Sequence, residues 1–174
     1  MGPVFTRKAC TCGWTGFYTN TEASFNAVVV EDLLHLAMDA YGVGRETLAD
    51  EELVEAFLDS CPDNIGMTKI TAPQVYNYQG KKPEDWGVSG FVLIAESHIS
   101  VHTFPERGYL NVDIFSCKDF DTDAVERDVL KAFNAEHVKV WLMERGTDYD
   151  SPRALYGAMV TDRVGLMAPK RDDQ

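Results

Sequence analysis

The fold is decided by residues 88–115, which read VSGFVLIAESHISVHTFPERGYLNVDIF. Within them, segments 88–95, 99–104 and 109–115 are apolar or alternate between apolar and polar residues, as strands do. Only a few residues separate one segment from the next. Such short connections favour antiparallel pairing, because parallel neighbours need a crossover of a dozen or more residues. The stretch therefore predicts three adjacent antiparallel strands.

Three helices are expected around these strands. Apolar residues recur at helical spacing over 26–41, and a glycine follows. A second helix is predicted over 48–58, with acidic residues in its first turn and an end before Pro62. Asp121 is a suitable N-cap for a third helix that runs to about Asn134.

The remaining segments complete the expected architecture. Further strands are predicted at 66–71 and 137–144, whereas 76–85 contains Gly, Pro and charged residues and is expected to be a loop. Residues 146–174 are expected to form a flexible or surface-wrapping tail. Strands with helices before and after them predict an α+β fold, in which helices cover one face of an antiparallel sheet.

Length and composition indicate one soluble domain, residues 1–174. The chain has 45% hydrophobic and 11% aromatic residues, and its longest apolar runs are far too short to cross a bilayer. No apolar segment follows the N-terminal basic pair, so we expect no secretory signal and place the protein in the cytoplasm. A net charge of -12 argues against a nucleic-acid partner, since phosphate recognition needs a basic face. Neither nucleic acid nor membrane is expected as a partner.

Neither the cysteines nor the histidines form a convincing metal site. Cys10 and Cys12 have no second close pair of Cys or His at zinc-site spacing, and the cysteines are expected to be thiols rather than disulfides. His98 and His102 lie on a predicted strand, where four residues span about 13 Å and cannot place two ligands on one zinc ion. No metal is expected.

The run from Ala95 to Glu106 puts reactive side chains into an apolar segment. It contains a Glu-Ser peptide bond, two histidines and a carboxylate after a proline, and such groups are costly to bury without partners. A serine-hydrolase triad is disfavoured, because neither Ser97 nor Ser89 lies in a G-x-S-x-G elbow. Each of these residues alone could have a structural role; a histidine, for example, can be buried with its hydrogen bonds satisfied. Their combination points to chemistry.

Residues 87–109 (GVSGFVLIAESHISVHTFPERGY) and then 112–117 (VDIFSC) closely resemble the prokaryotic S-adenosylmethionine decarboxylases, pyruvoyl-dependent enzymes of polyamine synthesis. The resemblance extends more loosely to the first predicted helix and to 144–146. It implies a zymogen that is cut into chains of residues 1–96 and 97–174. It also implies a homodimer, in which two sheets with their helices form a layered sandwich.

The resemblance implies that the chain cuts itself between Glu96 and Ser97. In that family the serine hydroxyl attacks the preceding carbonyl to form an ester, β-elimination follows, and the dehydroalanine loses ammonia to become the pyruvoyl group. By motif position, His102 is the processing base and Ser89 is the hydroxyl that steadies the ester. One geometric condition follows. Ser97 and His102 are five residues apart and would face opposite sides of an unbroken strand, so the chain must turn or open at the cleaved bond.

The same resemblance assigns the decarboxylation. The pyruvoyl carbonyl derived from Ser97 condenses with the substrate's α-amine as a Schiff base and accepts the electrons left by CO₂. Cys117 occupies the position of the proton donor, and the ordinary thiol pKa of about 8.5 suits that role. Glu106 is implied to bind the ribose hydroxyls of S-adenosylmethionine. The product would be the aminopropyl donor for spermidine synthesis.

The chain departs from the family around the expected substrate. A Phe replaces Trp, an Arg replaces Tyr and a Lys replaces Gly, at Phe104, Arg107 and Lys118. No aromatic residue clearly matches the ring that stacks on adenine, so Trp86 is the expected substitute, with Tyr76 or Tyr78 as alternatives. Residues 44–62 look like an inserted helix. These changes leave open a pyruvoyl-dependent arginine or ornithine decarboxylase, and a non-catalytic homologue that regulates a decarboxylase.

Overall fold

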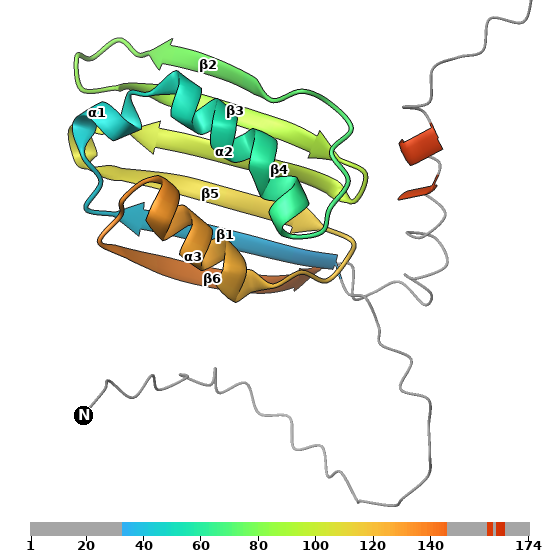
Figure 1. The fold of residues 1–174 in the computed structure, drawn as a ribbon. Helices are drawn as coiled ribbons and strands as arrows, with labels where there is room; N and C mark the ends of the chain where they lie inside the picture. Colours follow the sequence, from blue (N-terminus) through green and yellow to red (C-terminus); the bar gives the residue numbers. More distant parts are fainter. Residues whose placement is uncertain (1–32, 146–159, 162, 166–174) are drawn as a thin grey trace, which may run out of the picture.

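In the part of the chain that the structure describes, six strands form one antiparallel sheet in the order β2-β3-β4-β5-β1-β6 (Figure 1). The computed structural model describes residues 33–145, 160–161 and 163–165. In chain order the elements are β1 (Leu33–Tyr41), α1 (Arg45–Leu48), α2 (Glu51–Asn64), β2 (Gln74–Gln79), β3 (Trp86–Ile94), β4 (Ser97–Phe104), the 3-10 turn η1 (Pro105–Arg107), β5 (Tyr109–Ser116), α3 (Thr122–Ala132) and β6 (His137–Arg145).

Helices α2 and α3 cover one face of this sheet, and the opposite face carries no helix of the described chain (Figure 1). The core lies between the helices and the covered face, where alternate residues of the four inner strands are buried together with one face of each helix. Its largest fully buried side chains are Phe133, Leu36, Met38, Leu48, Leu58, Ile94, Ile99, Leu110, Ile114, Val54, Val88 and Val92. The predicted α+β arrangement, with helices on one face, is confirmed.

The three strands predicted from residues 88–115 are confirmed as β3, β4 and β5, and they pair antiparallel in chain order. Helix α2 packs closely on β3 at Gly90, where a Cβ would lie 2.7 Å from Cδ1 of Leu58. The third predicted helix and the last strand are also confirmed, as α3 and β6. Asp121 caps α3 by accepting a hydrogen bond from the Ala124 backbone N–H at 3.0 Å.

The helix predicted over 26–41 is wrong where the structure describes it, because residues 33–41 form β1; residues 26–32 lie outside the described chain. Leu36, Met38 and Ala40 are buried in strict alternation with more exposed neighbours, which is the period of a strand. Apolar residues on the open face hid this alternation and produced an apparent helical recurrence. Strand β1 pairs with β5 on one side and β6 on the other, so tertiary pairing determines its structure.

The helix predicted over 48–58 is longer than expected. It appears as α1 and α2, and α2 contains Pro62 in its last turn instead of ending before it. A proline there removes one backbone hydrogen bond, and burial of Cys61 and Pro62 against the core compensates for that loss. At the other end, Asp50 caps α2 by accepting the Leu53 N–H at 3.0 Å.

The strand predicted at 66–71 is also wrong, since only one isolated bridge, between Lys69 and Ile94, forms there. Part of the loop predicted at 76–85 is instead the edge strand β2, which pairs with β3. Most β2 side chains are exposed, so the strand lacks the apolar alternation by which strands are recognised. The loop itself is confined to residues 80–85.

Among the described residues, no helix is long and apolar enough to cross a membrane. The predicted tail at 146–174 lies almost entirely outside the described residues, as do Cys10 and Cys12. One tail residue has a defined contact with the sheet: Nη1 of Arg163 donates a hydrogen bond to the Ala95 carbonyl oxygen at 3.1 Å.

Candidate active site

The expected cleavage bond lies in the tight turn between β3 and β4. Ala95 and Glu96 form that turn, and Ser97 is the first residue of β4, paired with Ile94. The Glu96 side chain is only 4% exposed, and its Oε2 accepts the Thr68 backbone N–H at 3.0 Å. A turn is therefore present at this bond, but it lies before Ser97 and leaves β4 unbroken from Ser97 to His102. The Glu96 side chain is held by its hydrogen bond to Thr68.

Cys117 follows β5 and contacts the cleavage bond through its backbone. Its N–H donates a hydrogen bond to the Glu96 carbonyl oxygen at 3.2 Å. Ser116 is paired with Ser97 and holds the next turn, donating to the Lys118 carbonyl at 2.7 Å and accepting the Lys118 N–H at 2.9 Å. The Lys118 ammonium donates a hydrogen bond to the Gly66 carbonyl at 2.7 Å, so this cation contacts the segment that follows α2.

His102 and Ser89 form a separate pair on the open face of the sheet. They lie opposite one another on β4 and β3, and Nδ1 of His102 is 3.0 Å from Oγ of Ser89. Ser97 shares the alternation of Ile99, which is buried under the helices, whereas His102 has the opposite parity. His102 is five residues after Ser97, which corresponds to about 17 Å along β4. One protomer therefore does not bring Ser97 and His102 together.

Ser97 contacts a different histidine. Its Oγ lies 3.2 Å from Nδ1 of His98, the next residue of β4. The His98 ring also contacts Phe115 at its edge, with ring centroids 5.9 Å apart. Burial is the main cause that lowers the pKa of His98 below its usual value, and the neighbouring His35 adds to the effect.

Glu106 is held by residues from two other elements. Its Oε1 accepts hydrogen bonds from Nε of Arg45 at 2.9 Å and from Nε1 of Trp86 at 3.0 Å, and Nη2 of Arg45 lies 2.8 Å away. The hydrogen bond from Arg45, followed by that from Trp86, lowers the pKa of Glu106. Among the described residues no hydrogen bond or ion pair involves Oε2 of Glu106.

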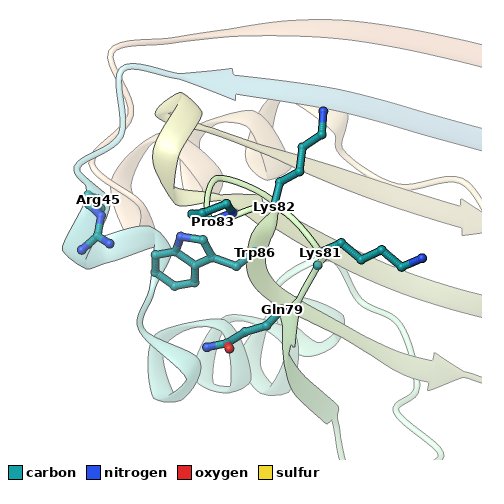
Figure 2. A pocket seen from close by; sticks show the side chains of 7 residues that line it. Arg45, Gln79, Lys81, Lys82, Pro83 and Trp86 are labelled. Atoms are coloured by element: carbon teal, nitrogen blue, oxygen red, sulfur yellow. The ribbon is translucent and has the colours of Figure 1, made fainter.

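Two cavities meet at Trp86. The smaller, of about 110 Å³, has Ser89, His102 and Phe104 in its wall. The larger, of about 500 Å³, lies against Arg45 and the 80–83 loop and is within the size range of ligand pockets. Figure 2 shows the Trp86 indole between Arg45 and Gln79, while the ammonium groups of the two loop lysines extend away from it.

The family model for S-adenosylmethionine decarboxylase matches residues 34–146, which include all the site residues named above. The chain belongs to the S-adenosylmethionine decarboxylase family. The predicted family is confirmed.

Relatives within the S-adenosylmethionine decarboxylase family span the same region. A protein of Archaeoglobus fulgidus named S-adenosylmethionine decarboxylase proenzyme is 39% identical over 115 residues, covering 64% of this chain and 96% of its own. A Thermotoga maritima protein of the same name is 35% identical over 113 residues, covering 64% and 82%. The crystal structure of the adenosylmethionine decarboxylase from Aquifex aeolicus matches with a TM-score of 0.55 and 30% identity, covering 68% of this chain and 94% of that one.

Sequence reasoning missed two side chains of this S-adenosylmethionine decarboxylase site. The contact of His98 with Ser97 depends on side-chain orientation and not on spacing, so no sequence pattern predicts it. Arg45 was missed because it lies 61 residues from Glu106 in the sequence and carries no local motif. Arg107, which replaces the family's Tyr, lies over the Phe104 ring with its Cζ 6.0 Å from the centroid. In the described residues, no three His, Cys, Asp or Glu side chains gather as metal ligands.

Proposed function

We propose that the chain is a proenzyme that cleaves itself between Glu96 and Ser97 and then decarboxylates S-adenosylmethionine. The product is the aminopropyl donor for spermidine synthesis. The supporting observation is the hydrogen bond from the Cys117 N–H to the Glu96 carbonyl, within a tight turn that presents this peptide bond. The names of the family's curated proenzymes support the same reaction.

The first step is attack of the Ser97 hydroxyl on the Glu96 carbonyl carbon. Negative charge develops on the carbonyl oxygen, and the Cys117 N–H is already directed at that oxygen. The C–N bond then breaks to leave an ester between Glu96 and Ser97. Because the buried Glu96 side chain is hydrogen-bonded to Thr68, the carbonyl is held in place while the serine moves.

Elimination and decarboxylation require two further proton transfers. The carbonyl of a pyruvoyl group at position 97 supplies the electron sink for loss of the substrate carboxylate. His102 removes the Cα proton of Ser97 during elimination, with its ring oriented by Ser89. Cys117 returns a proton to the substrate's α-carbon, and its position directly after Ser116, the partner of Ser97, places it at the reacting end of β4.

Substrate recognition is assigned to the cavities around Trp86. Oε2 of Glu106 accepts the ribose hydroxyls, and Arg45 and Trp86 keep the carboxylate ionised and oriented. The Arg45 guanidinium lies 5.0 Å from the Trp86 ring centroid and covers one face of the indole. Adenine would stack on the other face. Tyr78 borders the smaller cavity and remains the alternative ring.

The homodimer that we propose packs the open faces of two copies against one another. The open sheet face carries exposed apolar side chains, including Phe91, Leu93 and Trp141, of the kind that a second copy would cover. If two open faces pack together as layers, the partner's His102 lies in the interface, and Ser97, whose strand parity directs it to the covered face, must turn at the cleaved bond to meet it. The processing site would then combine two protomers.

Intact-mass measurement tests the first step. Wild-type protein should convert into residues 1–96 and a partner of 78 residues, 174 minus 96, with a blocked N-terminus. Ser97→Ala should remain one chain.

Release of CO₂ from S-adenosylmethionine, arginine and ornithine in parallel tests the substrate, and preference for either basic amino acid would overturn the assignment. A wild-type chain that stays uncut after long incubation would exclude the enzyme.

Coexpression tests the dimer. Mixed dimers of Ser97→Ala and His102→Ala chains contain one site with both an intact serine and an intact histidine, provided that the two residues come from different protomers. Every His102→Ala chain in a mixed dimer should then be cleaved, and none should be cleaved when that variant is expressed alone. Absence of cleavage in purified mixed dimers would show that both residues act within one protomer.

A further inference from the structure

His98 lies closer to the attacking hydroxyl than any other histidine in the described chain. Its Nδ1 is 3.2 Å from Ser97 Oγ, whereas His102 is about 17 Å away along β4. The hydroxyl therefore has a basic nitrogen at hydrogen-bond distance within the uncut protomer. The carbonyl that it attacks accepts a hydrogen bond from the Cys117 N–H at 3.2 Å.

We infer that His98 is the base that accepts the Ser97 hydroxyl proton during ester formation. His98 acts in this way only if the chain cleaves itself as proposed above. Two histidines then act in turn: His98 accepts the hydroxyl proton during ester formation, and His102 accepts the Cα proton during elimination.

The proton balance of the step needs one group that first accepts and then donates. As the Oγ–C bond forms at the Glu96 carbonyl, the hydroxyl proton passes to Nδ1 of His98. As the C–N bond breaks, the same proton passes to the Ser97 nitrogen, which becomes a free amine. The step is an isomerisation that consumes no water and no other reactant, and the imidazole ends it in its starting form.

The surroundings of His98 keep the imidazole in the neutral form that can accept a proton. Burial lowers its pKa most, and the charges of His35 and Arg145 lower it further, against the opposing effect of Asp113. Asp113 lies 3.4 Å from Nε2 of His35, so its carboxylate is paired with that ring. The edge contact with Phe115 limits rotation of the His98 ring.

Two substitutions separate a base from a structural residue. In His98→Asn the amide oxygen stands near the former Nδ1 and can still accept a hydrogen bond from Ser97, but it has no useful basicity. His98→Ala removes both properties. We expect either change to slow cleavage by about 100-fold or more, the usual range for loss of a general base, and added imidazole to restore part of the rate in His98→Ala. His137→Gln, on the exposed edge strand β6, is the matched control and should cleave at the wild-type rate.

Hydroxylamine identifies the step that is blocked, because it cleaves esters and not amides. His102→Ala should accumulate the ester, and hydroxylamine should release a Glu96 hydroxamate and a chain beginning with an unmodified Ser97. His98→Asn should hold the amide and give neither product. If His98→Asn instead accumulates a hydroxylamine-sensitive ester, or cleaves within about threefold of wild type, the inference is wrong.

The wild-type chain provides a test that does not depend on whether variants fold. The rate of ester formation, trapped with hydroxylamine, should fall with decreasing pH and reach half its plateau below pH 6.5, the usual pKa of histidine. A rate that stays constant down to pH 4.5, or that is half-maximal well above pH 6.5, would overturn the role of His98. A wild-type chain that forms no ester at any pH would instead refute the proposed self-cleavage.

Discussion

Replacement of Thr103 by valine should destabilise the protein more than any change in side-chain size explains. Thr103 is 3% exposed, and its Oγ1 accepts the Val88 N–H at 2.8 Å and donates to the Leu48 carbonyl at 2.7 Å. Valine keeps the shape but leaves both backbone groups buried without a partner. At about 1–3 kcal/mol for each unsatisfied group, the expected loss for the two groups is about 2–6 kcal/mol in the free energy of unfolding.

Urea denaturation in a Ser97→Ala background measures this loss on a chain that is not cut. Protomer concentration must be held constant, because any dimer contributes to apparent stability. Thr103→Ser is the matched control: it keeps the hydroxyl and should lose only about 1 kcal/mol for the missing methyl group. The reasoning fails if the valine variant lies within about 0.5 kcal/mol of its parent, or if serine costs as much as valine.

Three further outcomes are expected. Gly87→Ala would place a Cβ 2.0 Å from a backbone carbonyl oxygen of β4, so its thermal midpoint should fall well below that of Gly66→Ala, where no atom lies within 4 Å and only a positive φ is strained. Burial raises the pKa of Cys61 to about 12, so a thiol reagent at pH 8 should modify it only after unfolding; rapid labelling of the native protein, located by peptide mass, would contradict this. Arg45 lowers the pKa of Glu106, so the ionised carboxylate stabilises the fold above pH 4.5 and this contribution is lost as pH falls through the lower folded value. The thermal midpoint of Arg45→Met should therefore lie below that of wild type at pH 7 and approach it in acid, and an equal difference at both pH values would contradict the pairing.

The sequence contained enough local information to predict the centre of the fold. Strands β3, β4 and β5 are joined by short connections, and their apolar alternation is visible within a few residues. Strand β1 could not be predicted in the same way, because it is held by β5 and β6, which follow it by about 70 and 100 residues in the chain. Its open-face residue Ala37 is apolar and obscures the alternation. Edge strand β2 could not be predicted for another reason: most of its side chains are exposed, so its sequence shows no alternation of apolar and polar residues.

In the candidate site, too, local motifs could be predicted from the sequence and long-range contacts could not. Glu96, Ser97, His102 and Glu106 lie within eleven residues, and the motif they form could be recognised as a unit. The five-residue separation of Ser97 and His102 also correctly predicted their opposite orientation. Contacts that depend on long-range packing, such as that between Arg45 and Glu106, have no signal in a single sequence.

The strand order has a consequence for the processed molecule. Cleavage at residue 96 assigns β1, β2 and β3 to one polypeptide and β4, β5 and β6 to the other, yet β1 lies between β5 and β6. Three of the five ladders, β3–β4, β5–β1 and β1–β6, therefore join different polypeptides. The two products are interleaved, and they cannot separate without dismantling the hydrophobic core. The proposed self-cleavage would thus change the molecularity of unfolding. The uncut chain unfolds within one molecule, whereas the mature protomer would refold by an encounter between two chains, so its unfolding midpoint would rise with protein concentration.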